Sequence, residues 1–212
     1  MSFTINLTMK RLLILVLPAI LMLTGCALPG QPTQAVSYYI LTDPGPVHRS
    51  ATAHPGTLLV REMEAPPFYQ NTRFAFSRAP GTRGEYQYAQ WSEPTAQRLS
   101  WMLRQRLDAS GVFSVVAPLG SGVQGDYQLN TRLIDFYHDA AEAGPFSPGT
   151  ALMVMEAELV SRSSAVLIGR RVFVAQMPVA SFDAAGAADA LGRGANKVMD
   201  EVIAWLSGME MR

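Results

Sequence analysis

Short segments rich in β-forming residues recur along the chain, and several of them alternate apolar and polar residues with a period of two. Alternation of this kind is typical of strands that bury one face and expose the other. Before the first helical pattern it predicts strands at 37–41, 57–65, 72–77 and 85–91. After that helix it predicts strands at 112–116, 126–139, 151–161 and 165–179, with Ser161 to Ser164 as the hairpin connection between the last two.

Two segments instead repeat their apolar residues with a helical period. The first helix follows Ser92, a candidate cap, and Pro94, and it ends at Gly111. Its stripe consists of Leu99, Met102, Leu103, Arg106 and Leu107. The second helix covers about 182–206, with a stripe of Leu191, Ala195, Val198, Met199, Val202 and Leu206.

The order of these elements is strands, helix, four strands, helix. Each amphipathic helix needs an apolar sheet face, and the period-two strands leave their other face partly polar. We therefore expect an α+β fold, a mixed and mostly antiparallel sheet with two main helices packed on one face.

The N-terminal segment has a different pattern. Lys10 and Arg11 precede an apolar run at 12–23, which is too short for a membrane span of about 20 residues but fits the apolar region of a signal peptide. The run ends in a motif typical of the bacterial lipobox: Leu23, Thr24, Gly25 and Cys26. Cys26, the only cysteine, would carry a diacylglyceryl thioether and, after cleavage, an N-acyl chain such as palmitate. The alternative is a free cysteine in an ordinary leader.

This interpretation divides the chain into three parts. Residues 1–25 form the lipoprotein signal peptide, 26–37 the lipidated cysteine and a tether, and 38–212 a single domain; the true start is Met1 or Met9. The acyl chains anchor the protein to a membrane without spanning it. Because Ala27 follows the cysteine in place of an inner-membrane retention Asp, we expect the inner leaflet of the outer membrane, facing the periplasm.

Charge and cysteine content exclude several classes of protein. The chain has 17 basic and 17 acidic residues, and removal of Lys10 and Arg11 with the leader leaves 15 against 17, a net charge of about −2. A nucleic-acid-binding protein would need a strongly basic face. With Cys26 acylated, no thiol is left for a disulfide, a zinc site or a nucleophile.

No catalytic constellation emerges from the polar residues. The glycine motif at 120–125 precedes a strand instead of a helix, so we interpret it as a loop and not a dinucleotide site. His138 lies beside Asp135 and Asp139, where a metal or general-base role competes with a solvent-facing strand-end pair, which we favour. Glu62 and Glu64 would share one strand face, but nothing completes a carboxylate site. Hence we expect a non-enzyme without metal or cofactor, apart from its covalent lipid.

Aromatic residues carry the remaining signal. Tyr39, Tyr88 and Trp91 are best explained by packing in the core and sheet. The run Pro66, Pro67, Phe68 and Tyr69 differs, because a double-proline break followed by two aromatic rings is difficult to bury completely. It predicts a contact loop for a partner, and Phe146, between two prolines, marks a second one.

Taken together, these motifs resemble the ABC-type transport auxiliary lipoproteins, the paraquat-inducible protein C-like family. The resemblance extends over nearly all of the mature chain. It rests on lipobox Cys26, the Tyr38-Tyr39-x-Leu41 motif, the V-x(5)-P spacing from Val60 to Pro66, the Trp91-x-Glu93-Pro94 motif and the segment 110–116. We expect Tyr38, Tyr39, Leu41, Trp91, Glu93 and Pro94 to be structural.

The resemblance implies a non-catalytic accessory subunit of an intermembrane phospholipid transport system. Its partners would be a mammalian-cell-entry (MCE) domain protein and an inner-membrane ABC transporter or permease, and the protein could also form a homo-oligomer. Two alternatives belong to other classes. One is a structural lipoprotein of outer-membrane biogenesis, for lipopolysaccharide or barrel assembly, and the other is a periplasmic hydrolase that uses His138 or Asp135.

Overall fold

The computed structural model describes residues 34–43, 45–51, 53–141 and 147–211. The lipobox residues Leu23, Thr24, Gly25 and Cys26, and the loop residue Phe146, lie outside these ranges, so their roles stay predictions.

One compact unit covers Val36–Arg212. It contains, in order, β1 Ser37–Tyr39, β2 His54–Val60, the 3-10 turn η2 Pro67–Tyr69, β3 Arg73–Ser77, β4 Gly84–Trp91, α2 Thr95–Ser110, β5 Phe113–Pro118, β6 Tyr127–Asp139, β7 Thr150–Ser161, β8 Val166–Pro178 and α3 Ala184–Ser207.

The long strand β6 organises the sheet. On one side it pairs antiparallel with β7 along its whole length, and β7 pairs antiparallel with β8. On its other side two strands share it in parallel: β2 near its start and β3 near its end. Strand β5 continues the sheet beyond β2, and β4 and β1 continue it beyond β3. The mixed sheet is confirmed, and its longest pairings are the antiparallel ones.

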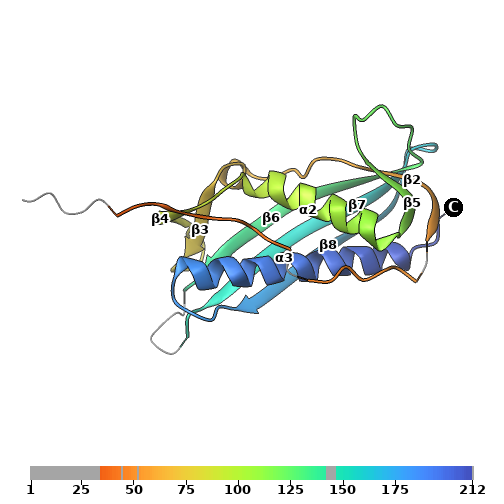
Figure 1. The fold of residues 1–212 in the computed structure, drawn as a ribbon. Helices are drawn as coiled ribbons and strands as arrows, with labels where there is room; N and C mark the ends of the chain where they lie inside the picture. The colour runs from red at the N-terminus through yellow and green to blue at the C-terminus, as the bar shows by residue number, and fades with distance from the viewer. Residues whose placement is uncertain (1–33, 44, 52, 142–146, 212) are drawn as a thin grey trace, which may run out of the picture. The chain divides into compact units, whose positions relative to one another are not determined.

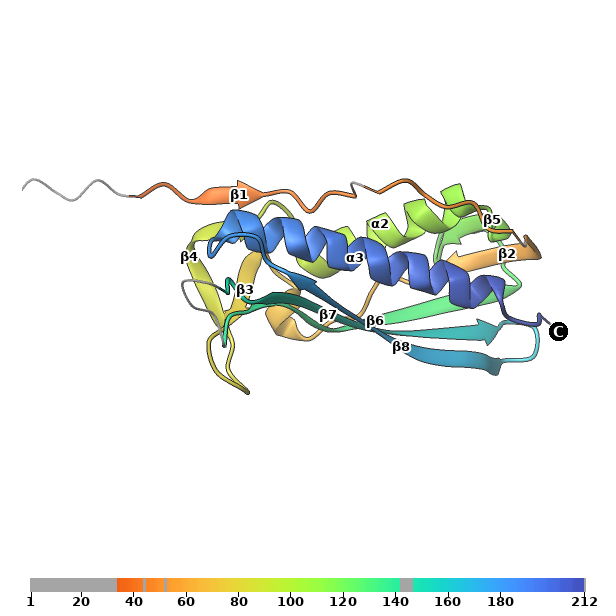
Figure 2. The same cartoon turned by 90° about the horizontal axis from the view of Figure 1, so that it is seen from below.

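Both helices lie on one face of the sheet, as Figure 1 and Figure 2 show. Helix α3 packs on β6, β7 and β8, while α2 packs on β5 and α3. Strand β7 explains why: its alternate residues Ala151, Met153, Met155, Ala157 and Leu159 are all buried against the helices. The expected α+β architecture, with two helices covering one sheet face, is therefore confirmed.

Two expected boundaries are wrong. Strand β2 ends at Val60 instead of Ala65, because the Met63 N–H donates to Ser100 Oγ of α2 and only Glu64 forms an isolated bridge, to Arg132. Helix α2 has Pro94 at its N-cap and no side-chain capping bond, so Ser92 is not its cap. Gly111 does end the helix, in the left-handed conformation (φ 66°) that glycine adopts without strain.

An aromatic cluster joins β1, β3 and β4. The ring of Trp91 stacks on Phe74 with centroids 4.4 Å apart, and the ring of Tyr39 meets Phe74 edge-on at 5.9 Å. The structural roles expected for Tyr39 and Trp91 agree with this packing. Tyr88 is more exposed than expected: it lies in the stretch between Glu85 and Gln90 where the β3–β4 register shifts, and the ring of Tyr86 contacts Phe74 instead.

Candidate interaction surface

The double proline forms an exposed turn between β2 and β3. Pro66 and Pro67 are exposed, and Phe68 is half-buried against the core. Hydrogen bonds fix the turn from behind: Gln70 Nε2 donates to the Ala65 carbonyl at 2.6 Å, and Asn71 Nδ2 donates to the carbonyls of Pro67 (3.2 Å) and Phe68 (3.3 Å). A turn held in this way presents its prolines in one fixed conformation.

Tyr69, expected to be part of the contact loop, is instead buried. Its hydroxyl donates to Asp135 Oδ1 at 3.2 Å, and burial raises the pKa of Tyr69. Arg83 Nη2 also donates to Asp135, at 2.7 Å. Asp135 therefore fastens the turn to β6, and the expectation that the ring of Tyr69 would be exposed is wrong. Its side chain supports the exposed prolines from below.

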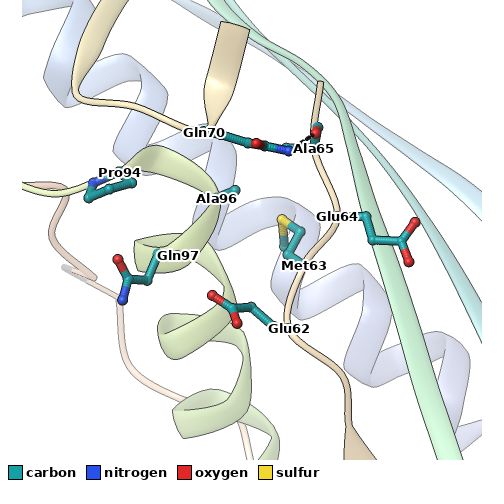
Figure 3. A pocket seen from close by; sticks show the side chains of 8 residues that line it. All are labelled: Glu62, Met63, Glu64, Ala65, Gln70, Pro94, Ala96 and Gln97. Carbon is teal, nitrogen blue, oxygen red and sulfur yellow. Dashed lines mark hydrogen bonds between the residues drawn. The ribbon is translucent and has the colours of Figure 1, made fainter. Parts of the chain in front are cut away.

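A surface hollow of about 600 Å³ lies beside this turn. One wall is the segment that follows β2, and the other is the first turn of α2 (Figure 3). Its lining residues are Glu62, Met63, Glu64, Ala65, Gln70, Pro94, Ala96 and Gln97. The floor is apolar and buried at Met63 and Ala96, while Glu62 and Glu64 on the rim are exposed, so the hollow combines an apolar base with an acidic edge.

The two glutamates do not form a carboxylate pair. They follow the end of β2, and Figure 3 shows their carboxylates pointing in opposite directions. Glu64 also lies 3.5 Å from Arg61 Nη1. The hollow therefore suits recognition of a basic or hydrogen-bond-donating group better than the chemistry of a carboxylate pair, in which the two carboxyls must converge on one substrate.

His138 is fully buried, so the expected solvent-facing pair with Asp135 or Asp139 is wrong. The Tyr86 hydroxyl and Nδ1 of His138 lie 2.6 Å apart, and Nε2 lies 2.6 Å from the carbonyl of Pro148. The carbonyl can only accept, so Nε2 carries the proton and Nδ1 accepts from Tyr86. Burial lowers the pKa of His138, which favours this neutral ring. The arrangement is one of a structural histidine.

Sequence reasoning did not foresee the most deeply buried charge, Arg106 on α2. Its side chain is 1% exposed and forms ion pairs with Asp43, between β1 and β2, and with Asp200 on α3. The guanidinium Nε lies 2.6 Å from Asp43 Oδ2. A signal was present, because an arginine within an apolar helical stripe requires buried partners.

The described part of the chain contains no cluster of three or more metal-ligating side chains. Within residues 34–43, 45–51, 53–141 and 147–211, neither helix is long and apolar enough to cross a bilayer. The candidate surface is thus the exposed, fixed turn at Pro66 and Pro67 with its neighbouring hollow.

A family model described as the ABC-type transport auxiliary lipoprotein component matches residues 39–203. The match begins within the Tyr38-Tyr39-x-Leu41 motif and ends near the end of α3. It therefore includes the turn, the hollow and both helices. No curated protein matches the chain in sequence.

Solved structures share the fold. A Xanthomonas campestris protein of the DUF330 family is 24% identical with a TM-score of 0.68, and the match covers 80% of this chain and 94% of that one. A protein described only as uncharacterized is 19% identical with a TM-score of 0.62, over 81% and 98% of the two chains. The PelC dodecamer of Paraburkholderia phytofirmans is 13% identical with a TM-score of 0.48, over 77% and 95%. At that similarity, its assembly says nothing about this chain.

Proposed function

Because the chain belongs to the family of ABC-type transport auxiliary lipoprotein components, we propose that it docks an MCE-domain partner in intermembrane phospholipid transport. In this proposal Cys26 carries the diacylglyceryl and N-acyl lipid and anchors the protein in the inner leaflet of the outer membrane. The domain faces the periplasm and works without catalysis beside an inner-membrane ABC transporter or permease.

The observation that carries the proposal is the fixed turn at Pro66 and Pro67. Exposed prolines lose little conformational entropy on binding, and the hydrogen bonds of Gln70 and Asn71 have already ordered the backbone. The adjacent hollow offers an apolar floor and the acidic side chain of Glu62, while the carboxylate of Glu64 at its edge points away from α2 (Figure 3). A protein partner could insert an apolar or basic side chain there, which is how hot spots form at interfaces.

A family role in transport supports the lipid-transport form of the proposal more than the alternative, a structural lipoprotein of outer-membrane biogenesis. Both share the lipid anchor, and they differ in the partner that the turn would bind. The hydrolase alternative has weaker support, because His138 and Asp135 are engaged in structural hydrogen bonds.

Affinity capture from mildly solubilised envelopes tests the proposal, with partners identified by mass spectrometry. We expect the wild-type protein to recover an MCE-domain protein. The triple variant Glu62→Arg/Pro66→Ala/Pro67→Ala should weaken the affinity by about 30-fold, the effect of losing one interface hot spot of about 2 kcal/mol, and recovery should fall accordingly. Since all three side chains are exposed, the variant should stay folded, with a melting temperature lowered by only a few degrees because the unfolded chain gains freedom without the two prolines.

The matched control is Pro80→Ala, an exposed proline in the β3–β4 turn, which should leave recovery intact. Recovery of barrel-assembly or lipopolysaccharide-assembly proteins would favour the biogenesis alternative. Unfolding of the triple variant would show that the turn belongs to the core. A parallel capture with Cys26→Ala measures how much of the interaction depends on the anchor.

A further inference from the structure

Three exposed apolar residues occupy alternate positions around β1. Val36, Tyr38 and Ile40 are 37%, 67% and 62% exposed. Between and after them, Tyr39 packs its ring against Phe74 and Leu41 is buried. The first strand of the domain therefore attaches to the core by one face and presents apolar side chains on the other.

Strand β4 extends this surface. Tyr38 lies in register with Gln90, and side chains of paired residues share a face. Tyr88, two residues before Gln90, is 39% exposed. We refer to Val36, Tyr38, Ile40 and Tyr88 as the β1 patch.

The charges next to the β1 patch neutralise each other. Arg73 of β3 also pairs in register with Gln90, and its Nη1 lies 2.6 Å from Glu85 Oε1 on β4. The patch itself carries no charged side chain, so its own attraction to another surface comes from its apolar and aromatic side chains. Electrostatic attraction to an anionic surface would contribute little.

The position of the β1 patch in the sequence indicates that a membrane surface lies near it. Only nine residues lie between Cys26 and Val36, so ten Cα–Cα steps join them. That length reaches about 35 Å when fully extended and about 18 Å on average as a flexible coil. With a lipid on Cys26, which is part of the function proposed above, the patch stays within this distance of a bilayer at all times.

We propose that the β1 patch rests on the phospholipid surface next to the anchor and holds the domain in one orientation. Tyrosine suits this place, since its ring can lie among acyl chains while its hydroxyl remains at the headgroups. Figure 2 shows β1 on the helix side of the sheet, so this side would face the membrane and the uncovered face of β6, β7 and β8 would face away. Because the contact is apolar, it should not weaken as salt is added.

Amide hydrogen exchange on a chemically tethered protein tests this inference. The chain from Cys26 onward is coupled through its only thiol to a maleimide phospholipid, in vesicles of phosphatidylethanolamine and phosphatidylglycerol. The reference is the same protein with its thiol capped by a soluble maleimide, mixed with the same vesicles. The tether is synthetic, so a failure here is distinct from a failure of Cys26 to be lipidated in the cell.

We expect amides in 36–41 to exchange several-fold more slowly on the tethered protein, at low and high salt alike. The variant Tyr38→Ser/Ile40→Ser should abolish this slowing. The control Val172→Ser/Val174→Ser, two exposed residues of β8, should retain it. Melting curves of the untethered variants verify that each is folded. Equal exchange in both forms, slowing in another segment only, or slowing that survives Tyr38→Ser/Ile40→Ser would overturn the proposal.

Discussion

At the scale of single residues, His138 couples stability to pH. Its neutral ring accepts from the Tyr86 hydroxyl and donates to Pro148, and burial keeps its pKa below the ordinary value of 6.5. Burial also raises the pKa of Tyr86 to about 12, so that hydroxyl remains a donor at every pH of interest. A protonated ring would lose the acceptor at Nδ1.

The direction of the pH effect follows from the lowered pKa. Below pH 6.5 the unfolded chain binds a proton at His138 that the folded chain does not, so acid favours unfolding. We expect the contribution of His138 to the free energy of unfolding to have its full value above about pH 6.5. It should fall as the pH drops toward the pKa of His138 in the folded protein. Urea unfolding at a series of pH values measures this.

Two variants test whether His138 causes this dependence of the free energy of unfolding on pH. His138→Phe should be less stable than the wild type at neutral pH but should lose the slope that begins just below pH 6.5, because it has no proton to bind there; the slope at more acid pH should remain, since the lowered pKa of Asp183 also makes stability fall in acid. His48→Ala, at an exposed position, should keep the slope. A slope that persists unchanged in His138→Phe would mean that another group is responsible.

At the scale of secondary-structure elements, Arg106 connects three parts of the chain. It belongs to α2, and its partners are Asp43 in the segment between β1 and β2 and Asp200 on α3. Hydrogen bonding to Asp43 raises the pKa of Arg106, so the guanidinium stays charged. Without the guanidinium, the carboxylates of Asp43 and Asp200 would have no positive charge between them.

Arg106→Met should therefore lower the free energy of unfolding by about 3 kcal/mol, the cost of breaking a buried ion pair at one partner. Arg170→Met is the matched control, because Arg170 also pairs with a glutamate but is 55% exposed; its loss should cost less than about 1 kcal/mol. Chemical denaturation of both variants gives the comparison. Similar losses in the two variants would show that burial of Arg106 adds nothing.

The elements themselves were predictable from sequence, and their side-chain contacts were not. In strands β6 to β8 and helix α3 the apolar residues recur with a regular period over a long stretch, and such a pattern can be recognised from the local sequence alone. The end of β2 depends on Ser100, and the burial of His138 depends on Tyr86; both partners are distant in sequence. The exposure of Pro66 and Pro67 was foreseen, but the hollow was not, since its second wall begins at Pro94.

At the scale of the whole molecule, the domain starts at β1. The compact unit begins at Val36, and Tyr39 of β1 covers the ring of Phe74. The strand is short, yet it completes the aromatic cluster around Trp91. The family match begins at Tyr39, the last residue of this strand.

Two truncations test this boundary. A chain that starts at Val36 should unfold at the same temperature as one that starts at Cys26. A chain that starts at Leu41 lacks β1 and should be less stable by about 2 kcal/mol, the value of burying one large apolar side chain. Thermal unfolding of the three chains decides; equal stability of all three would remove β1 from the core fold.

The connection from β1 into the body of the protein has a mechanical consequence. A pull on the N-terminal tether acts along β1, where three residue pairs with β4 resist it together in shear. Immediately beyond, the Leu41 carbonyl accepts from Arg98 Nε, and Asp43 binds Arg106, so the load passes into α2. A pull on the tether would thus reach α2 through these contacts as well as β4 through the strand pairing.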